Sequence, residues 1–156
     1  MRAATAALRR DLIGREAQIR AQGVLLAVDP ATFANVAWWR PDFAPSLDSI
    51  LGTLRSDEQA VLVNPEFARR HQLQVGDLFD INVDGVRVDL RLAGTLGYFP
   101  TLYPEDGDRL VARLDYLARV LETEPSEVWL RTGPRRHEQT ITALEAPSNR
   151  KVVIHD

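Results

Sequence analysis

The chain has 156 residues, the length of one ordinary domain or two small lobes, which is enough to bury a hydrophobic core. Its formal net charge at pH 7 is −3, whereas nucleic-acid-binding proteins usually carry a strongly basic surface. Nucleic acid is therefore not an expected partner. The chain has no cysteine, which excludes disulfides and thiol nucleophiles, and it has no apolar run of the roughly 20 residues that a membrane-spanning helix needs, so we expect it to be soluble.

A helix followed by a buried strand is expected first. Residues 3–10 (AATAALRR) are rich in alanine and favour a short helix. Residues 18–29 have strand character, and residues 24–28 (VLLAV) are continuously apolar. Such a run is typical of a strand covered on both faces, so we expect a central strand of a sheet here.

Two short helices are expected after this strand. Asp29 is a helix-capping residue and Pro30 suits the first helical turn, so the pair predicts a helix over 31–38. A proline-bracketed link follows, and residues 46–54 (SLDSILGTL) then repeat apolar side chains three and four positions apart. This spacing places four residues on one helix face. They are Leu47, Ile50, Leu51 and Leu54.

The next elements are a strand and a third helix. Residues 60–63 (AVLV) are an apolar strand. Asn64 supplies a cap and Pro65 suits the first helical turn, so a helix is expected to run to residue 70 or 71.

The clearest local pattern is a β-hairpin over 77–92. Apolar and polar residues alternate on both sides of Asp84 and Gly85, a favoured two-residue turn. Residues 93–98 contain two glycines, so the second strand is expected to continue there with a bulge or a bend.

The last third of the chain is expected to alternate between helices and strands. Residues 102–108 form a turn-rich loop, and 110–121 carry leucines at helical spacing. A strand is expected over 127–131, a helix over 134–146 and a strand over 150–155. A strand-helix-strand unit of this kind usually has parallel strands in one sheet.

These elements predict an α+β fold with a mixed sheet, a lobe that contains the β-hairpin and a strand-helix-strand unit. Residues 1–156 are expected to form a single domain. It divides into two small lobes, a β-rich lobe over 60–100 and an α/β lobe made of 18–59 and 101–156.

One aspartate raises the question of catalysis. Asp77 follows Gly76 in the stretch RRHQLQVGDLFDINVDG, and a catalytic aspartate on a tight turn is one interpretation of this pair. It has no acidic, histidine or lysine companion nearby in the sequence. We therefore expect a structural turn, with the carboxylate accepting hydrogen bonds from backbone N–H groups.

The acidic loop PEDGD, residues 104–108, is the best candidate for a hard cation. It lacks the spaced ligands of a twelve-residue calcium loop, so the preferred interpretation is a solvated turn with its carboxylates near the start of a helix. His71, His137 and His155 lie on separate expected elements, and no serine elbow or phosphate-binding loop is present. No catalytic, cofactor-binding or metal residue is therefore predicted.

Aromatic residues suggest where a partner would bind. Most of them are expected in the core or between lobes. An exposed group around Tyr98, Phe99 and Tyr103 would instead be a contact surface for a partner.

The order of several segments resembles the extracytoplasmic domain of FtsX-like permeases of ABC transporters, the MacB-like group. In that family a strand ending in Val-Asp-Pro precedes an aromatic segment, and a Leu-x-Val-Gly-Asp turn then leads into a hairpin. The matching segments are VLLAVDPATF (24–33), AWWRPDF (37–43), AVLVNPEFARRHQLQVGDLFDI (60–81), AGTLGYFP (93–100) and EVWLRTGP (127–134). Together they cover residues 24–131, which is most of the chain.

The resemblance implies a MacB periplasmic core domain-like fold and a mechanical function. Members of the family have membrane helices that a separate cytoplasmic ATPase moves, and their outer domains bind partners or cargo and transmit the movement. The implied partners are membrane segments of the same parent chain, the ATPase indirectly, and an extracytoplasmic protein or lipid cargo. The implied location is the extracytoplasmic face of the cell membrane. No catalytic residue is carried over.

Two other interpretations remain open. A helix, a Val-Gly-Asp turn and a hairpin also resemble the molybdopterin-dinucleotide-binding barrels of oxidoreductases, although the strand-helix-strand unit argues against a small β-barrel. A metal-dependent enzyme that uses the PEDGD loop is the third possibility.

Overall fold

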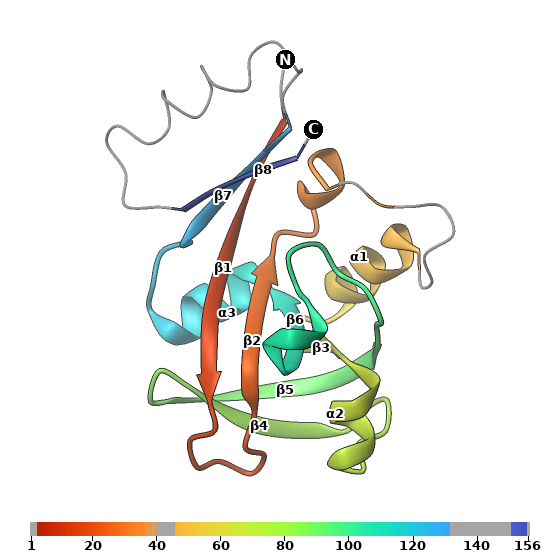
Figure 1. Cartoon of the computed structure of the whole chain (residues 1–156), viewed down its shortest axis with the longest axis vertical. Helices are drawn as coiled ribbons and strands as arrows, with labels where there is room; N and C mark the ends of the chain where they lie inside the picture. Colours follow the sequence, from red (N-terminus) through yellow and green to blue (C-terminus); the bar gives the residue numbers. More distant parts are fainter. Residues whose placement is uncertain (1–2, 38, 40–45, 132–150, 156) are drawn as a thin grey trace.

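The structure, a computed structural model, describes residues 3–37, 39, 46–131 and 151–155. Its strands lie in one sheet and are crossed by three α-helices and two short 3-10 helices (Figure 1). The strands are β1 (Ala3–Ile13), β2 (Gln22–Val28), β3 (Ala60–Val63), β4 (Leu78–Val83), β5 (Val86–Thr95), β6 (Asp108–Arg113), β7 (Glu127–Arg131) and β8 (Lys151–His155). The helices are η1 (Phe33–Asn35), α1 (Leu47–Ser56), α2 (Pro65–Arg70), η2 (Pro104–Asp106) and α3 (Leu114–Leu121).

The sheet is mixed, which confirms the α+β class expected from the sequence. Its strand order is β4-β5-β3-β6-β2-β1-β7-β8. The pairs β2 with β6, β3 with β5 and β7 with β8 are parallel, and the other neighbours are antiparallel. The parallel pairing of β7 with β8 confirms the expectation for the two C-terminal strands, while the helix expected over 134–146 lies outside the described residues. The division into two lobes stays a prediction.

The central strands are buried on both faces because they contribute to two separate hydrophobic cores. Successive side chains of a strand point to opposite faces, so Leu25 lies in one core and Leu26 in the other. The same alternation holds for β3 and β6. This confirms the two-sided burial expected for residues 24–28, of which every side chain is buried.

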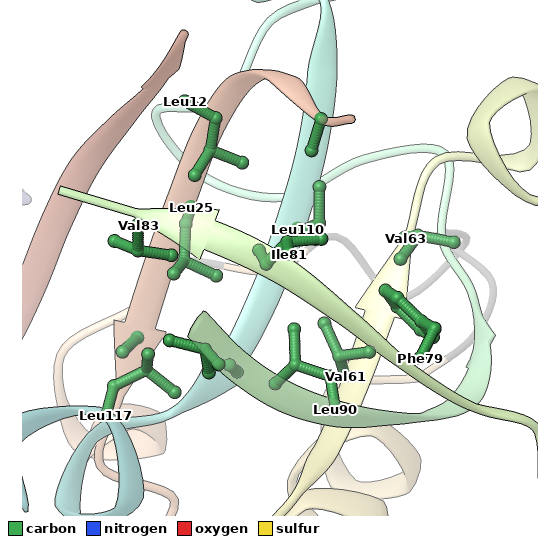
Figure 2. Close-up of a cluster of buried hydrophobic side chains, with 14 of the residues drawn as sticks. Leu12, Leu25, Val61, Val63, Phe79, Ile81, Val83, Leu90, Leu110 and Leu117 are labelled. Atoms are coloured by element: carbon green, nitrogen blue, oxygen red, sulfur yellow. The ribbon is translucent and has the colours of Figure 1, made fainter. Parts of the chain in front are cut away.

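The first core lies inside the curl of the sheet. Side chains from β1, β2, β3, β6 and the β4-β5 hairpin meet there, with α3 at one side (Figure 2). The second core lies on the opposite face and is covered by η1, α1 and the segment between β5 and β6. Burying apolar area on both faces of one sheet is what stabilises a chain of this size.

Backbone hydrogen bonds close the curl at the β4 edge. The amide of Ile19 donates to the carbonyl of Asp80 at 3.1 Å, and the amide of Gln18 donates to the Asp80 carboxylate at 2.8 Å. The link between β1 and β2 therefore lies along β4, and it occupies part of an edge that would otherwise be open to another strand.

The predicted helix over 3–10 is wrong, because these residues form the first part of β1. Strand β1 pairs with β2 through residues 7–13 and with β7 through residues 3–7. Ala7 and Leu8 are both fully buried, one in each core. Two ladders and two buried faces outweigh the helix propensity of alanine, which is worth less than about 1 kcal/mol per residue.

The predicted helix over 110–121 is half correct. Residues 110–113 belong to β6, and helix α3 begins only at Leu114. Leu110 pairs with Leu25 in the parallel ladder between β2 and β6. The leucine pattern runs without a break through the end of the strand and into the helix, so the pattern alone does not show where one ends and the other begins.

The helix expected over 31–38 is reduced to η1. The Asp29 carboxylate accepts hydrogen bonds from the amide of Ala31 and from the hydroxyl of Thr32, at 2.9 and 3.1 Å. Asp29 therefore stabilises a turn and does not cap an α-helix. The helix expected over 46–54 is confirmed as α1. Ser46 caps it by accepting from the amide of Ser49 at 3.2 Å.

The other sequence-based elements are confirmed. Strand β3 and helix α2 occupy the expected positions. In the hairpin, Asp84 and Gly85 have φ values of 52° and 87°, as the favoured tight turn requires. The register between β3 and β5 shifts at residue 93, which is the expected bulge.

Candidate functional site

The segment over 96–107 joins β5 to β6 and carries the predicted partner contact. Leu96, Phe99 and Leu102 are buried, whereas Tyr98 is half-buried and Tyr103 is 58% exposed. The buried side chains fasten the segment to the second core. Phe99 is only 1% exposed, so its side chain is not available to contact a partner. The role of Tyr98 and Tyr103 as partner contacts stays a prediction.

Aromatic rings hold this segment in place. Phe99 stacks on Phe33 with ring centroids 5.2 Å apart, and Phe33 contacts Trp129 of β7 at 5.3 Å. Trp39 packs edge-on against Tyr98 at 5.4 Å. Burial raises the pKa of the Tyr98 hydroxyl, and the neighbouring Tyr103 adds to the effect. The segment is thus anchored through its apolar side chains and presents tyrosine at its surface.

Arg9 joins this segment to two strands of the sheet. Its Nε donates to Oε2 of Glu127 on β7 at 2.5 Å, and its Nη2 donates to the hydroxyl of Thr101 at 2.5 Å. Glu127 is 1% exposed and also accepts from the indole N–H of Trp129 at 2.9 Å. We call Arg9, Glu127 and Thr101 the clamp.

Thr101 has an unusual backbone conformation within the clamp. Its φ of 67° lies in the left-handed region, which a β-branched residue rarely adopts. The two hydrogen bonds from Arg9, to its hydroxyl and to its carbonyl at 3.5 Å, help to hold it there. Strained backbone of this kind persists only where the surroundings fix it.

A polar cleft of about 760 Å³ lies beside the same segment. Its floor is formed by Asp108, which pairs with Arg70 and accepts from the amide of Gln22 at 2.9 Å. Asn64, at the end of β3, accepts from the amide of Arg109 at 2.9 Å. The cleft residues are Arg20, Gln22, Asn64, Glu66, Arg70, Arg109 and residues 104–108. Carboxylates and arginines alternate around it, so it has no single sign of charge.

The two aspartates of the PEDGD loop are engaged in this local structure. Asp106 accepts from the amide of Tyr103 at 2.8 Å, which holds the turn of η2, and Asp108 lies in the ion pair with Arg70. Among the described residues, no three acidic or histidine side chains are gathered closely enough to hold a metal ion.

The remaining candidates from the sequence are structural where they are described. Asp77 accepts from the amide of Gln74 at 2.8 Å, so the expected turn role is confirmed. His71 packs against Phe67 with ring centroids 4.7 Å apart. Burial lowers the pKa of His71, and the nearby Arg70 lowers it further. His137 and the side chain of His155 lie outside the described residues.

Three strand ends lie side by side at one end of the sheet. Ala3 at the start of β1 pairs with Arg131 of β7, and Arg131 pairs with His155 at the end of β8 (Figure 1). The strands by which the chain enters and leaves the fold are therefore separated by a single strand. No helix in the described part of the chain has both the length and the apolar character needed to cross a bilayer.

No protein-family model matches the sequence, and no curated protein matches it. Among solved structures, the chain is similar to the extracellular domain of the noncanonic ABC-type transporter YknZ from Gram-positive bacteria. The two share 10% sequence identity with a TM-score of 0.50, over 88% of this chain and 69% of that one. The resemblance inferred from the order of segments is thereby confirmed at the level of the fold. The barrel alternative stays untested.

Proposed function

We propose that this chain is the extracytoplasmic domain of an ABC transporter permease. It binds a partner or cargo outside the membrane, and it couples ATP-driven movement of the membrane helices to transport or release. The fold shared with a transporter's extracellular domain supports this proposal. Its partners are membrane segments of the same parent chain, the cytoplasmic ATPase indirectly, and a protein or lipid cargo.

The observation that carries the proposal is the position of the two outer strand ends. Neighbouring strands lie about 4.8 Å apart, so Ala3 and the end of β8 are about 10 Å apart, across one intervening strand. Packed helices have axes about 8–10 Å apart. Two adjacent membrane helices can therefore continue directly from these two strands.

The proposed role is mechanical and not catalytic. Two acidic side chains of the polar cleft have structural contacts, because Asp106 accepts from a backbone amide and Asp108 pairs with Arg70. The half-buried Tyr98 and exposed Tyr103 offer an amphipathic surface, which suits a protein or lipid partner.

The location is tested by labelling an introduced cysteine in the full-length protein in its own membrane. Glu16 lies between β1 and β2, and its side chain is 88% exposed. The variant Glu16→Cys, in a full-length protein with every cysteine outside this chain replaced by serine, should react with a membrane-impermeant maleimide in intact cells, because the proposal places this exposed position outside the membrane. Labelling that occurs only after lysis would place the domain in the cytoplasm and refute the proposal.

The partner surface is tested by photo-crosslinking in the same full-length complex. A photoreactive phenylalanine analogue at Tyr103 should capture a protein or lipid partner. The matched control is the same analogue at Arg119 on α3, whose side chain is also well exposed. Equal capture at both positions, or no capture at Tyr103 during turnover, would remove this surface from the proposal.

A further inference from the structure

The clamp connects the membrane-facing strands of the proposed function to the tyrosine-bearing segment. Arg9 lies on β1, two residues beyond Ala7, where the pairing of β1 with β7 ends. Past this point β1 pairs with β2 alone. The Arg9 side chain bridges this fork, because it contacts Glu127 on β7 and Thr101 in the 96–107 segment.

The fork is also fastened through the backbone. The amide of Arg9 donates to the Ser126 hydroxyl at 2.9 Å, and the amide of Ser126 donates to the carbonyl of Ala7 at 2.9 Å. Sliding or splaying of β1 against β7 would therefore change the position of Arg9 relative to Glu127. Glu127 cannot follow freely, since its other oxygen is held by Trp129, a core residue.

The far end of the bridge holds a residue in a strained backbone conformation. Thr101 is held in a left-handed conformation, and loss of the Arg9 hydrogen bonds would allow it to relax. Tyr98 lies three residues before Thr101 and Tyr103 two residues after it, so they are the two tyrosines nearest to Thr101 in the sequence. The bridge therefore has a charge-assisted pair at one end, with Glu127 buried, and a strained residue at the other.

We propose that the clamp is a mechanical relay, in which displacement of β1 against β7 releases Thr101 and repositions the segment that carries Tyr98 and Tyr103. Arg9 is a positioning residue and makes no contact with cargo in this scheme. The relay rests on the proposed function, because it is that function which assigns the ends of β1 and β8 to the membrane. The relay specifies how movement at the ends of β1 and β8 would reach Tyr98 and Tyr103, through Arg9 and Thr101.

The relay is tested by tying β1 to β7 and measuring amide hydrogen exchange in the 156-residue chain. The variant Ala3→Cys with Arg131→Cys joins two paired residues far from the clamp, and the chain has no other cysteine. Opposite residues in an antiparallel ladder alternate between hydrogen-bonded and non-hydrogen-bonded pairs, whose Cα–Cα distances differ. The pair Ala6→Cys with Val128→Cys has the other geometry and is used if the first pair does not form a disulfide.

Oxidation should slow exchange of the 96–107 amides by roughly tenfold relative to the reduced protein, because the clamp then opens less often. The same comparison is made in a Thr101→Val background, which keeps the side-chain shape and removes the hydroxyl that Arg9 contacts. There the segment should exchange faster, and oxidation should no longer affect it. A disulfide between β4 and β5, from Asn82→Cys with Arg87→Cys, is the matched control and should leave the segment unchanged.

Three results would overturn the relay. They are equal exchange of the segment in the oxidised and reduced forms, an effect that survives Thr101→Val, and an equal effect from the β4-β5 disulfide, which would mean general stabilisation. These measurements need no membrane and no transport. Failure of the relay is therefore distinct from failure of the proposed function, which depends on labelling of Glu16→Cys in cells.

Discussion

Gly23 is the position where an added methyl group should be most damaging. It is the second residue of β2 and pairs with Asp108 at the start of β6. A Cβ at this position would lie 1.9 Å from the carbonyl oxygen and 2.4 Å from the amide nitrogen of Asp108. The φ of Gly23 is 159°, at the limit of the range that residues with a side chain rarely adopt, so backbone conformation adds to the requirement for glycine that the lack of space already imposes.

The size of the effect follows from what must move. The added Cβ would lie about 1.5 Å closer to the Asp108 carbonyl oxygen than ordinary van der Waals contact allows. The oxygen is a backbone atom and the Cβ is attached to the backbone, so neither can rotate away and the two strands must separate. Overpacking of this kind costs about 1–3 kcal/mol, and each lost backbone hydrogen bond costs about 1 kcal/mol more. We expect Gly23→Ala to lower the free energy of unfolding by about 3 kcal/mol, or the Tm by about 6–12 °C.

Urea denaturation followed by tryptophan fluorescence measures this difference, since Trp129 is fully buried. Gly52→Ala is the matched control, because nothing lies within 4 Å of a Cβ there and Gly52 is inside α1. That variant should stabilise the protein by about 0.5–1 kcal/mol. A Gly23→Ala protein within about 0.5 kcal/mol of the unmodified chain would refute the close approach of β2 and β6.

Three further predictions concern single side chains. Glu127→Gln leaves the charge of Arg9, whose side chain is only 18% exposed, without its partner and should cost about 3 kcal/mol in urea unfolding, whereas Arg9→Leu with Glu127→Leu should cost less than that single change; a cost below about 1 kcal/mol for Glu127→Gln contradicts the ion pair. Because the folded pKa of His71 is lowered, the unfolded chain takes up more protons there, and stability should fall as pH drops below about 6.5. His71→Phe should reduce this loss between pH 7.5 and 5.5, and an unchanged pH profile would exclude His71 as its source. Ser46→Ala removes the cap of α1 and should cost about 1 kcal/mol, while Ser56→Ala at the other end of the helix should be nearly neutral; equal effects would argue against the cap.

The sequence predicts elements well where local signals and tertiary packing agree. The hairpin at Asp84 and Gly85 has a turn that only a few residue pairs favour, and its alternation matches burial on one face. Helix α1 has both a serine cap and an apolar stripe. In each case residues close together in the sequence determine the element, and the tertiary packing agrees with them.

The errors arise where partners distant in the sequence determine the local structure. Residues 3–10 become a strand because β2 and β7 lie on either side of them, and β7 begins at Glu127. Residues 110–113 become a strand because β2 and β3 pair with them. Alanine and leucine spacing carry no information about these ladders.

The clamp was missed for the same reason. Arg9 is 92 residues from Thr101 and 118 from Glu127, and none of the three belongs to a recognisable motif. The proposed partner surface has a local signal in the sequence, a cluster of aromatic residues around a segment with glycines and a proline, and it stays a prediction. Which of them is exposed depends on the second core, so Phe99 could not be separated from Tyr103 by sequence alone.

The position of β1 has a consequence for how the chain acquires its structure. Strand β1 precedes the other strands of this sheet in the chain, and it lies between β2, its neighbour in sequence, and β7, which is more than 110 residues away. A hairpin of β1 and β2 can form early, but the buried ion pair and the second ladder of β1 must wait until residue 131 is available. Closing such a long loop slows folding. During synthesis one flank of β1 stays unpaired, and it is then the part of the chain most exposed to pairing with the wrong strand.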